Sequence, residues 1–259
     1  QIRLNKHMSL KKLMADNSFA LVNNTMWIGI PKVATSSLYP VFKNVSTTYY
    51  NDNDEFLNNS KNNNINKLWC IWRDPWERWL SAVIQDYEYK FDLGIVRNGV
   101  KQHRDLTDKE LSELYNELTI DWKFSHLNLK NRKFQHSGIY LARYITLLWK
   151  LINERFNCQE ISFYTLPKIE IAIKENLNIE LDIPKLNVSN VENTHRLGVL
   201  LKEKDFYGLW KNQYQEDLNL NKVIDKNKRS TRFGYDYWNN NILYVNKSRY
   251  NKIPIGKMQ

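Results

Sequence analysis

Short apolar runs in this chain alternate with stretches whose apolar residues recur at helical spacing. The runs at 25–30 and 67–72 have the length and composition of buried strands, and 160–165 alternates enough to be a third strand. After the second run, Pro75 and Glu77 form a helix start, and apolar residues then recur on one helical face. Strands alternating with helices predict an α/β fold with a central, mostly parallel sheet flanked by helices.

Other polar and apolar patterns fill in the remaining elements. Thr107 and Glu110 have the spacing of a capping box, which predicts a helix from there to about Leu118. Polar composition predicts loops at 51–66 and 92–105. The further predicted helices are 139–152, a helix that Pro167 starts and that ends near 176, and a helical region over 200–225 that breaks near Asp217.

Composition indicates a folded globular protein. Of the 259 residues, 42% are hydrophobic and 13% aromatic, which is enough to bury a large core. We expect a single domain over 1–259, with a polar leader at 1–20 and an irregular aromatic and basic tail at 229–259. No apolar run approaches the ~18 residues of a membrane-spanning helix, so the chain as given is expected to be soluble.

The charge balance favours anionic partners. Lysine and arginine total 38 against 28 acidic residues, a net charge of +10, which suits nucleotides, acidic glycans or nucleic acid. A solvated basic surface explains the same excess equally well. The two cysteines, Cys70 and Cys158, form neither a disulfide framework nor a metal cluster, so no metal is expected.

The first segment with candidate chemistry follows the first strand. Pro31 and Lys32 come directly after the apolar run, and the hydroxyls of Thr35, Ser36 and Ser37 precede a second apolar run with helical character. A strand, a tight turn and a helix N-terminus present N–H groups and positive potential to an anion. The segment therefore predicts a cradle for a nucleotide phosphate.

A second candidate anion site follows the second strand. Arg73 stands at its carboxyl end, where ligands bind in open α/β sheets, and Ser81 lies two turns into the next helix. Arginine binds phosphate through two parallel hydrogen bonds, and the serine can add a hydroxyl. The alternative is that Arg73 pairs with Asp74 or Glu77 and only fastens the helix.

Together, the segments IPKVATSS (30–37) and WRDPWERWLSA (72–82) resemble the carbohydrate sulfotransferases, which use 3′-phosphoadenosine-5′-phosphosulfate (PAPS). The resemblance is to the branch of the chondroitin and dermatan 4-O-sulfotransferases, and it implies a P-loop-NTPase-like three-layer fold. It assigns the 3′-phosphate to Arg73 and Ser81. It assigns the 5′-phosphosulfate to the first segment, through Pro31, Lys32, Val33, Ala34, Thr35, Ser36 and Ser37.

The implied activity is in-line transfer of a sulfuryl group from PAPS to a hydroxyl of a carbohydrate acceptor, for which an anionic glycan is one candidate. Lys32 would stabilise charge on the leaving adenosine 3′,5′-bisphosphate, and no metal is needed. The predicted catalytic residues are Lys32 and His136, with His136 as the candidate general base. The other candidates for the base are His126, Asp52, Asp54 and Glu55.

Two other functions remain open from the sequence. A nucleotide-dependent kinase is disfavoured because the glycines of a Walker A motif are missing around Lys32. A non-catalytic basic module that binds glycan or nucleic acid would use the interleaved Trp, Tyr, Lys and Arg residues. Nucleic acid is the less favoured partner, because most tryptophans fall on apolar faces. The acceptor, the sulfated position, the oligomeric state, the source and the compartment (cytoplasmic or Golgi-type lumenal) are left open.

Overall fold

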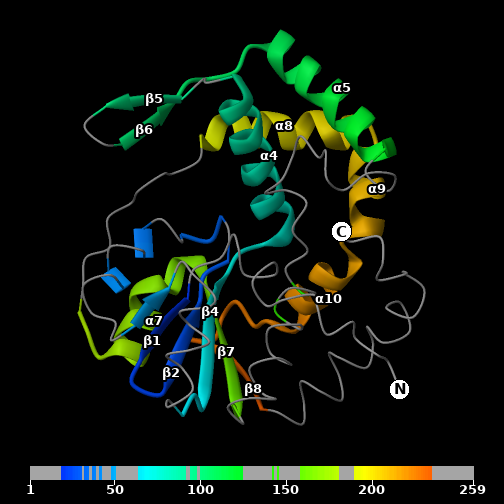
Figure 1. Cartoon of the computed structure of the whole chain (residues 1–259). Helices are drawn as coiled ribbons and strands as arrows, with labels where there is room; N and C mark the ends of the chain where they lie inside the picture. The colour runs from blue at the N-terminus through cyan, green and yellow to red at the C-terminus, as the bar shows by residue number, and fades with distance from the viewer. Residues whose placement is uncertain are drawn as a thin grey trace. The chain divides into compact units, whose positions relative to one another are not determined.

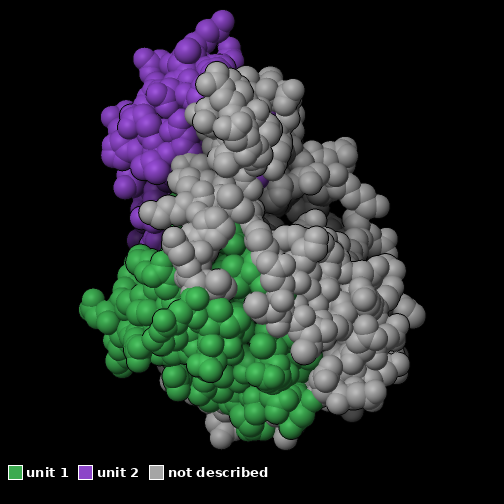
Figure 2. All heavy atoms as spheres, turned by 90° about the vertical axis from the view of Figure 1, so that its left-hand side faces the viewer, with its two compact units in different colours: residues 1–73, 141–184, 222–244 green, residues 74–140, 185–221, 245–259 purple. Residues whose placement is uncertain are grey.

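A computed structural model describes most of the chain in two compact units, which Figure 2 shows in different colours. Each unit is built from three segments that alternate along the sequence: 1–73, 141–184 and 222–244 in unit 1, and 74–140, 185–221 and 245–259 in unit 2. The single domain expected over 1–259 stays a prediction. The described residues are 19–30, 32–34, 37–38, 41–42, 48–50, 64–91, 94–97, 100–124, 142, 145, 158–180 and 190–234.

Unit 1 contains a six-stranded sheet in the order β3-β1-β2-β4-β7-β8 (Figure 1). Its central strands are parallel: β2 pairs with β4, and β4 pairs with β7. The pairs β1–β2, β1–β3 and β7–β8 are antiparallel. The strands are β1 Phe19–Val22, β2 Thr25–Ile28, β3 Thr48–Tyr50, β4 Lys67–Trp72, β7 Glu160–Thr165 and β8 Thr231–Gly234.

The α/β class is confirmed, but the prediction of a mostly parallel sheet is wrong, because the sheet is mixed. A tight turn at Asn23 and Asn24 joins β1 to β2 as a hairpin, and Asn23 has a φ of 54°. Asparagine tolerates this left-handed conformation, so the turn reverses the chain and makes the pair antiparallel. At the other edge β8 runs antiparallel to β7, within the tail that was expected to be irregular.

The central strands agree well with the apolar runs. Strands β4 and β7 have the predicted bounds, and β2 ends two residues earlier than expected, at Ile28. On one face Trp27 stacks on Phe42, with ring centroids 4.4 Å apart. After β7 a short 3₁₀ helix, η3 (Leu166–Lys168), leads into α7 (Ile169–Leu177), so the helical stretch begins one residue before the predicted start at Pro167.

Unit 2 is mainly helical, and an aromatic cluster forms its core. Trp76 stacks on Trp79 at 5.2 Å, and Trp210 stacks on Tyr214 at 5.1 Å between ring centroids. These rings pack with buried aliphatic residues of several helices. The elements are α4 Pro75–Phe91, α5 Asp108–Phe124, α8 Val191–Glu203, α9 Phe206–Gln213, the larger part of α10 Gln215–Val223, and a hairpin of β5 Gly94–Arg97 and β6 Val100–His103.

Two boundary predictions in unit 2 are confirmed and two are wrong. Helix α4 begins at Pro75, and the capping box opens α5, which continues past Leu118. The expected loop at 92–105 contains the β5–β6 hairpin. The helical region predicted over 200–225 begins earlier, at Val191, and breaks at Lys204–Asp205 and at Tyr214, whereas Asp217 lies within α10. No helix of the described residues combines the length and the apolar character of a membrane span.

Candidate functional site

The turn after β2 has an unusual backbone at Lys32 and Ala34. Their φ angles are 66° and 62°, in the left-handed region that favours glycine. Val33, between them, is buried, and the Ala34 carbonyl accepts hydrogen bonds from the N–H groups of Ser37 and Leu38, each 3.0 Å long. The predicted strand, turn and helix start are therefore present in this order.

The left-handed residues show what this loop can do chemically. Each costs on the order of 1 kcal/mol at a residue other than glycine, so the surroundings must hold it in place. Burial of Val33 and Leu38 supplies that anchorage. Left-handed turns ahead of a helix N-terminus direct backbone N–H groups toward one point, and such concavities bind anions. Here lysine and alanine adopt the conformation for which a Walker A loop uses glycine.

The sheet places Arg73 at the same edge as this loop. Strands β2 and β4 are parallel neighbours in the register Ile28↔Cys70, so both carboxyl ends lie at one edge of the sheet. Lys32 follows β2, and Arg73, which is half-buried, follows β4. Two basic side chains therefore come from adjacent strands at the edge where open α/β sheets bind ligands.

Helix α4 begins with a side-chain cap directly after Arg73. The Asp74 carboxylate accepts hydrogen bonds from the N–H groups of Trp76 (3.0 Å) and Glu77 (3.3 Å). The Asn221 side-chain amide donates to the other Asp74 oxygen at 3.3 Å. Asp74 thus fixes the helix start, as N-cap aspartates do. Ser81 lies on α4 in unit 2, and its side chain is buried.

Several predicted site residues lie outside the described residues, so the roles assigned to them stay predictions. These are Pro31, Thr35 and Ser36 in the first segment, and all candidates for the general base: His126, His136, Asp52, Asp54 and Glu55.

A polar cluster surrounds Glu175 in unit 1, and no motif in the sequence predicts it. The buried Tyr164 hydroxyl donates to the Glu175 carboxylate at 3.0 Å and accepts from the Asn176 amide at 3.0 Å. The same carboxylate pairs with Arg229 at 3.2 Å and with Arg232 at 3.7 Å. Burial raises the pKa of Tyr164 to about 12, so this phenol is protonated near neutral pH. Strand β7 is buried on both faces from Ile161 to Tyr164, so Tyr164 is a core residue, but no spacing in the sequence links it to residues near 230.

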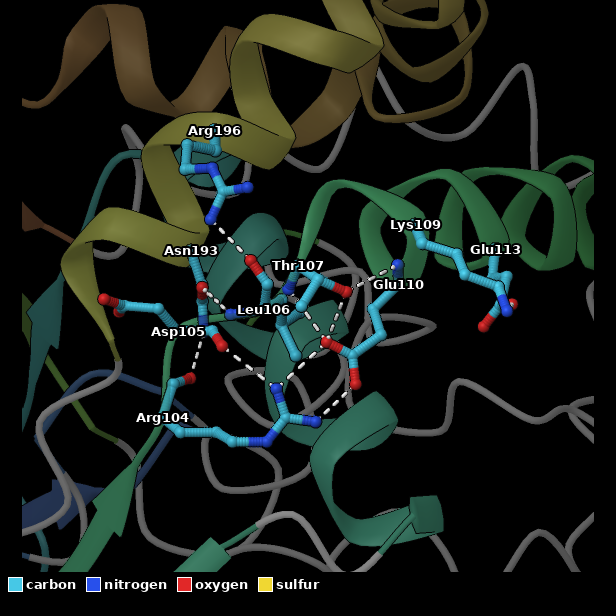
Figure 3. Close-up of polar contacts among 9 residues, drawn as sticks. All are labelled: Arg104, Asp105, Leu106, Thr107, Lys109, Glu110, Glu113, Asn193 and Arg196. Carbon is cyan, nitrogen blue, oxygen red and sulfur yellow. Dashed lines mark hydrogen bonds and ion pairs between the residues drawn. The ribbon is translucent and has the colours of Figure 1, made fainter.

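A second network clamps the segment before α5 onto α8, in unit 2 (Figure 3). Asn193 is fully buried; its carbonyl oxygen accepts from the Leu106 N–H and its amide donates to the Arg104 carbonyl, both at 2.8 Å. Arg104 forms a two-pronged ion pair with Glu110, the capping-box carboxylate. The polar atoms of Asn193 are satisfied within the protein, so this network holds the segment in place.

Within the residues that the structure describes, no group of three or more His, Cys, Asp or Glu side chains is placed to hold a metal ion. Burial raises the pKa of the Cys70 thiol, which makes it a poor nucleophile. Comparisons of the chain with family models, with curated proteins and with solved structures returned no match.

Proposed function

We propose that the chain is a sulfotransferase that moves a sulfuryl group from PAPS to a hydroxyl of a carbohydrate acceptor, and that its fold is P-loop-NTPase-like. The observation that carries the proposal is the position of two basic segments at the carboxyl ends of neighbouring parallel strands, with Lys32 after β2 and Arg73 after β4. The resemblance of both segments to the PAPS-binding motifs of carbohydrate sulfotransferases names the donor.

The residues of the first segment suit a phosphosulfate group. The left-handed backbone at Lys32 and Ala34, ahead of the helical residues Ser37 and Leu38, offers N–H donors to an anion. Lys32 adds a positive charge on the same loop. In the proposed reaction it stabilises the negative charge that grows on the 5′-phosphate as the leaving group departs.

The second segment would hold the 3′-phosphate. The Arg73 guanidinium can bind two phosphate oxygens at once, and the resemblance assigns Ser81 to the same phosphate. Two charged anchors at the two ends of a bisphosphate orient it for in-line transfer. PAPS supplies the sulfuryl group: its sulfur–oxygen bond to the phosphate breaks while a bond to the acceptor oxygen forms. The acceptor proton passes to a general base, for which we propose His136.

A transfer assay with labelled PAPS tests the role of Lys32. We expect Lys32→Ala to lower turnover by about 100-fold or more, because one charge that acts in the transition state is removed. Lys211→Ala, at an exposed lysine of α9, is the matched control and should retain activity. Circular dichroism checks that both variants are folded. Unchanged turnover in folded Lys32→Ala would overturn the assignment.

Ligand-induced thermal shifts test the nucleotide itself. We expect adenosine 3′,5′-bisphosphate to raise the melting temperature of the chain, and Arg73→Ala to remove most of that shift, because Arg73 would bind the 3′-phosphate. ATP, which has no 3′-phosphate, should produce a smaller shift. A large shift with ATP and none with the bisphosphate would instead identify a nucleoside triphosphate enzyme, which is the kinase alternative.

A further inference from the structure

Residues 222–232 carry a dense positive charge that the proposed transfer site does not use. This basic turn, as we name the segment 222–232, contains Lys222, Lys226, Lys228, Arg229 and Arg232 against the single acid Asp225. All five basic residues are exposed. Lys228 pairs with Asp225 at 3.8 Å, but its side chain is still 71% exposed, and the side chain of Arg229 is 70% exposed, so most of their surface is available to a partner.

Internal hydrogen bonds hold the basic turn in one shape. The Asp225 N–H donates to the Thr231 hydroxyl at 2.8 Å, and the Asn227 N–H donates to the Asp225 carboxylate at 2.9 Å. Ile224 and Phe233 are buried on either side and anchor both ends of the turn. A charged surface that is already ordered loses little conformational entropy when a ligand binds.

Lys168 forms hydrogen bonds with two backbone carbonyls of the turn. Its ammonium group donates to the carbonyl of Lys226 at 2.7 Å and also to the carbonyl of Lys228. These carbonyls would otherwise present partial negative charge to an approaching anion. Because these two carbonyls already accept hydrogen bonds from Lys168, an approaching anion meets mainly the positive side chains of the turn.

Glu175 fixes the two arginines without covering them. Its carboxylate lies 3.2 Å from Arg229 Nε and 3.7 Å from Arg232, and its own side chain is only 19% exposed. A guanidinium group has five N–H donors. The Glu175 carboxylate is shared between both arginines and Tyr164, and Arg232 Nε also donates to the Ser230 hydroxyl at 3.3 Å, so only part of the donors is engaged. The exposed donors remain positioned for a second anion.

The topology puts the basic turn at the ligand-binding edge of the unit 1 sheet. Strand β8 is antiparallel to β7 in the register Thr231↔Phe163, so the turn before β8 lies where β7 ends. Because β7, β4 and β2 are parallel, their carboxyl ends share this edge. The edge therefore carries Lys32, Arg73, Lys168 and the basic turn. They adjoin β2, β4, β7 and β8, which are neighbours in the sheet.

We propose that the basic turn binds a sulfated or carboxylated glycan chain. Several lysines and arginines within a short ordered segment match a polymer that repeats its negative charge. Surfaces that bind single-stranded nucleic acid usually add aromatic side chains for base stacking, and residues 222–232 contain none. Binding requires neither donor nor transfer, so the inference goes beyond the proposed function.

The test uses the full chain without PAPS and a fluorescent heparin octasaccharide as the probe. The variant Lys222→Gln/Lys226→Gln/Lys228→Gln removes three exposed charges from the basic turn. The control Lys109→Gln/Lys204→Gln/Lys211→Gln removes three exposed lysines of unit 2 and leaves the turn intact. Fluorescence anisotropy over a series of salt concentrations gives both the affinity and its salt dependence.

We expect the turn variant to bind the octasaccharide roughly 10-fold to 100-fold more weakly than the unchanged chain, with a salt slope reduced by about 2 to 3. The control should bind within about 3-fold of the unchanged chain, because only long-range charge is altered. Equal losses in both variants, or none in the turn variant, would overturn the proposal. So would tighter binding of a single-stranded oligonucleotide of matched charge that is lost in the turn variant.

The proposed transferase function can fail independently of this result. The thermal shift with adenosine 3′,5′-bisphosphate is measured on the turn variant as well, and we expect it to persist because Lys32 and Arg73 are unchanged. A retained shift with lost glycan binding separates the two anion sites. An uncharged maltooligosaccharide of the same length should not bind, and tight binding of it would contradict a charge-based surface.

Discussion

Individual polar side chains decide how the segment before α5 is held, and Asn193 is the most constrained of them. It is fully buried and satisfies one backbone N–H and one backbone carbonyl 87 and 89 residues away in sequence. Asn193→Leu should lower the free energy of unfolding by about 2–4 kcal/mol, because the buried Leu106 N–H and the part-buried Arg104 carbonyl both lose their partner. Asn212→Leu, at an exposed position on α9, should change it by less than about 0.5 kcal/mol. Urea unfolding followed by tryptophan fluorescence measures both, and equal values would show that the clamp contributes nothing.

The ion pair beside this clamp makes stability depend on pH. The Arg104 guanidinium and the Thr107 N–H lower the pKa of Glu110 to about 2 from an ordinary 4.5. A carboxyl group whose pKa is lowered by folding stabilises the folded state when it is ionised. That contribution is complete above about pH 4.5 and is lost as the pH falls toward 2.

Glu110→Gln should therefore lose stability at pH 6 and show a smaller fall in melting temperature between pH 5 and pH 2.5 than the unchanged chain. Glu113→Gln, one turn further along α5 and 54% exposed, is the control and should keep the original fall. Scanning calorimetry at a series of pH values measures the fall in melting temperature of each variant. The same fall in both variants would rule out Glu110 as the source of the dependence.

At the scale of elements, the hairpin that sets the sheet's mixed character depends on Asn23. Its φ of 54° is costly for residues with a branched side chain and cost-free for glycine. Asn23→Val should lower the free energy of unfolding by about 1–2 kcal/mol, whereas Asn23→Gly should leave it unchanged or raise it slightly. Asn24→Val serves as the positional control, since the strain is specific to a positive φ. Denaturant unfolding of the three variants would refute the account if Asn23→Gly were the most destabilised.

The elements that the sequence predicted well are those whose signals are local. The bounds of β4 and β7, the start of α4 at Pro75 and the capping box at Thr107 follow from a few neighbouring residues. The β5–β6 hairpin also has a local signal, since Asn98-Gly99 between its strands is a pair that favours hairpin turns, although the polar composition of 92–105 predicts a loop. By contrast, β8 has only Phe233 buried, so its pairing with β7 depends on a partner about 70 residues away and leaves no periodicity to detect.

The same distinction explains how much of the candidate site was predictable. The strand, turn and helix start around Lys32 follow from an apolar run that meets a proline and a group of hydroxyls. Left-handed backbone at Lys32 and Ala34 could not be predicted, because neither residue favours it and only packing of Val33 and Leu38 makes it tolerable. The Glu175 cluster joins β7, α7 and the basic turn, so it exists only once the sheet has formed.

At the scale of the whole molecule, the two units share one chain that returns to each of them more than once. Neither unit is a continuous stretch, so no single cut in the gene isolates either of them. The arrangement in unit 1 also explains why its basic residues gather at one edge. Lys32, Arg73 and Lys168 each follow a parallel strand, and the basic turn precedes an antiparallel one.

The position of β8 matters while the protein is being made. A ribosome releases β1, β2, β4 and β7 before β8, because α7, α8, α9 and α10 lie between β7 and β8 in the sequence. Until β8 emerges, one edge of β7 lacks its partner strand in this sheet, and another nascent chain could pair with that edge. Premature termination before Thr231 would leave this side of β7 permanently exposed.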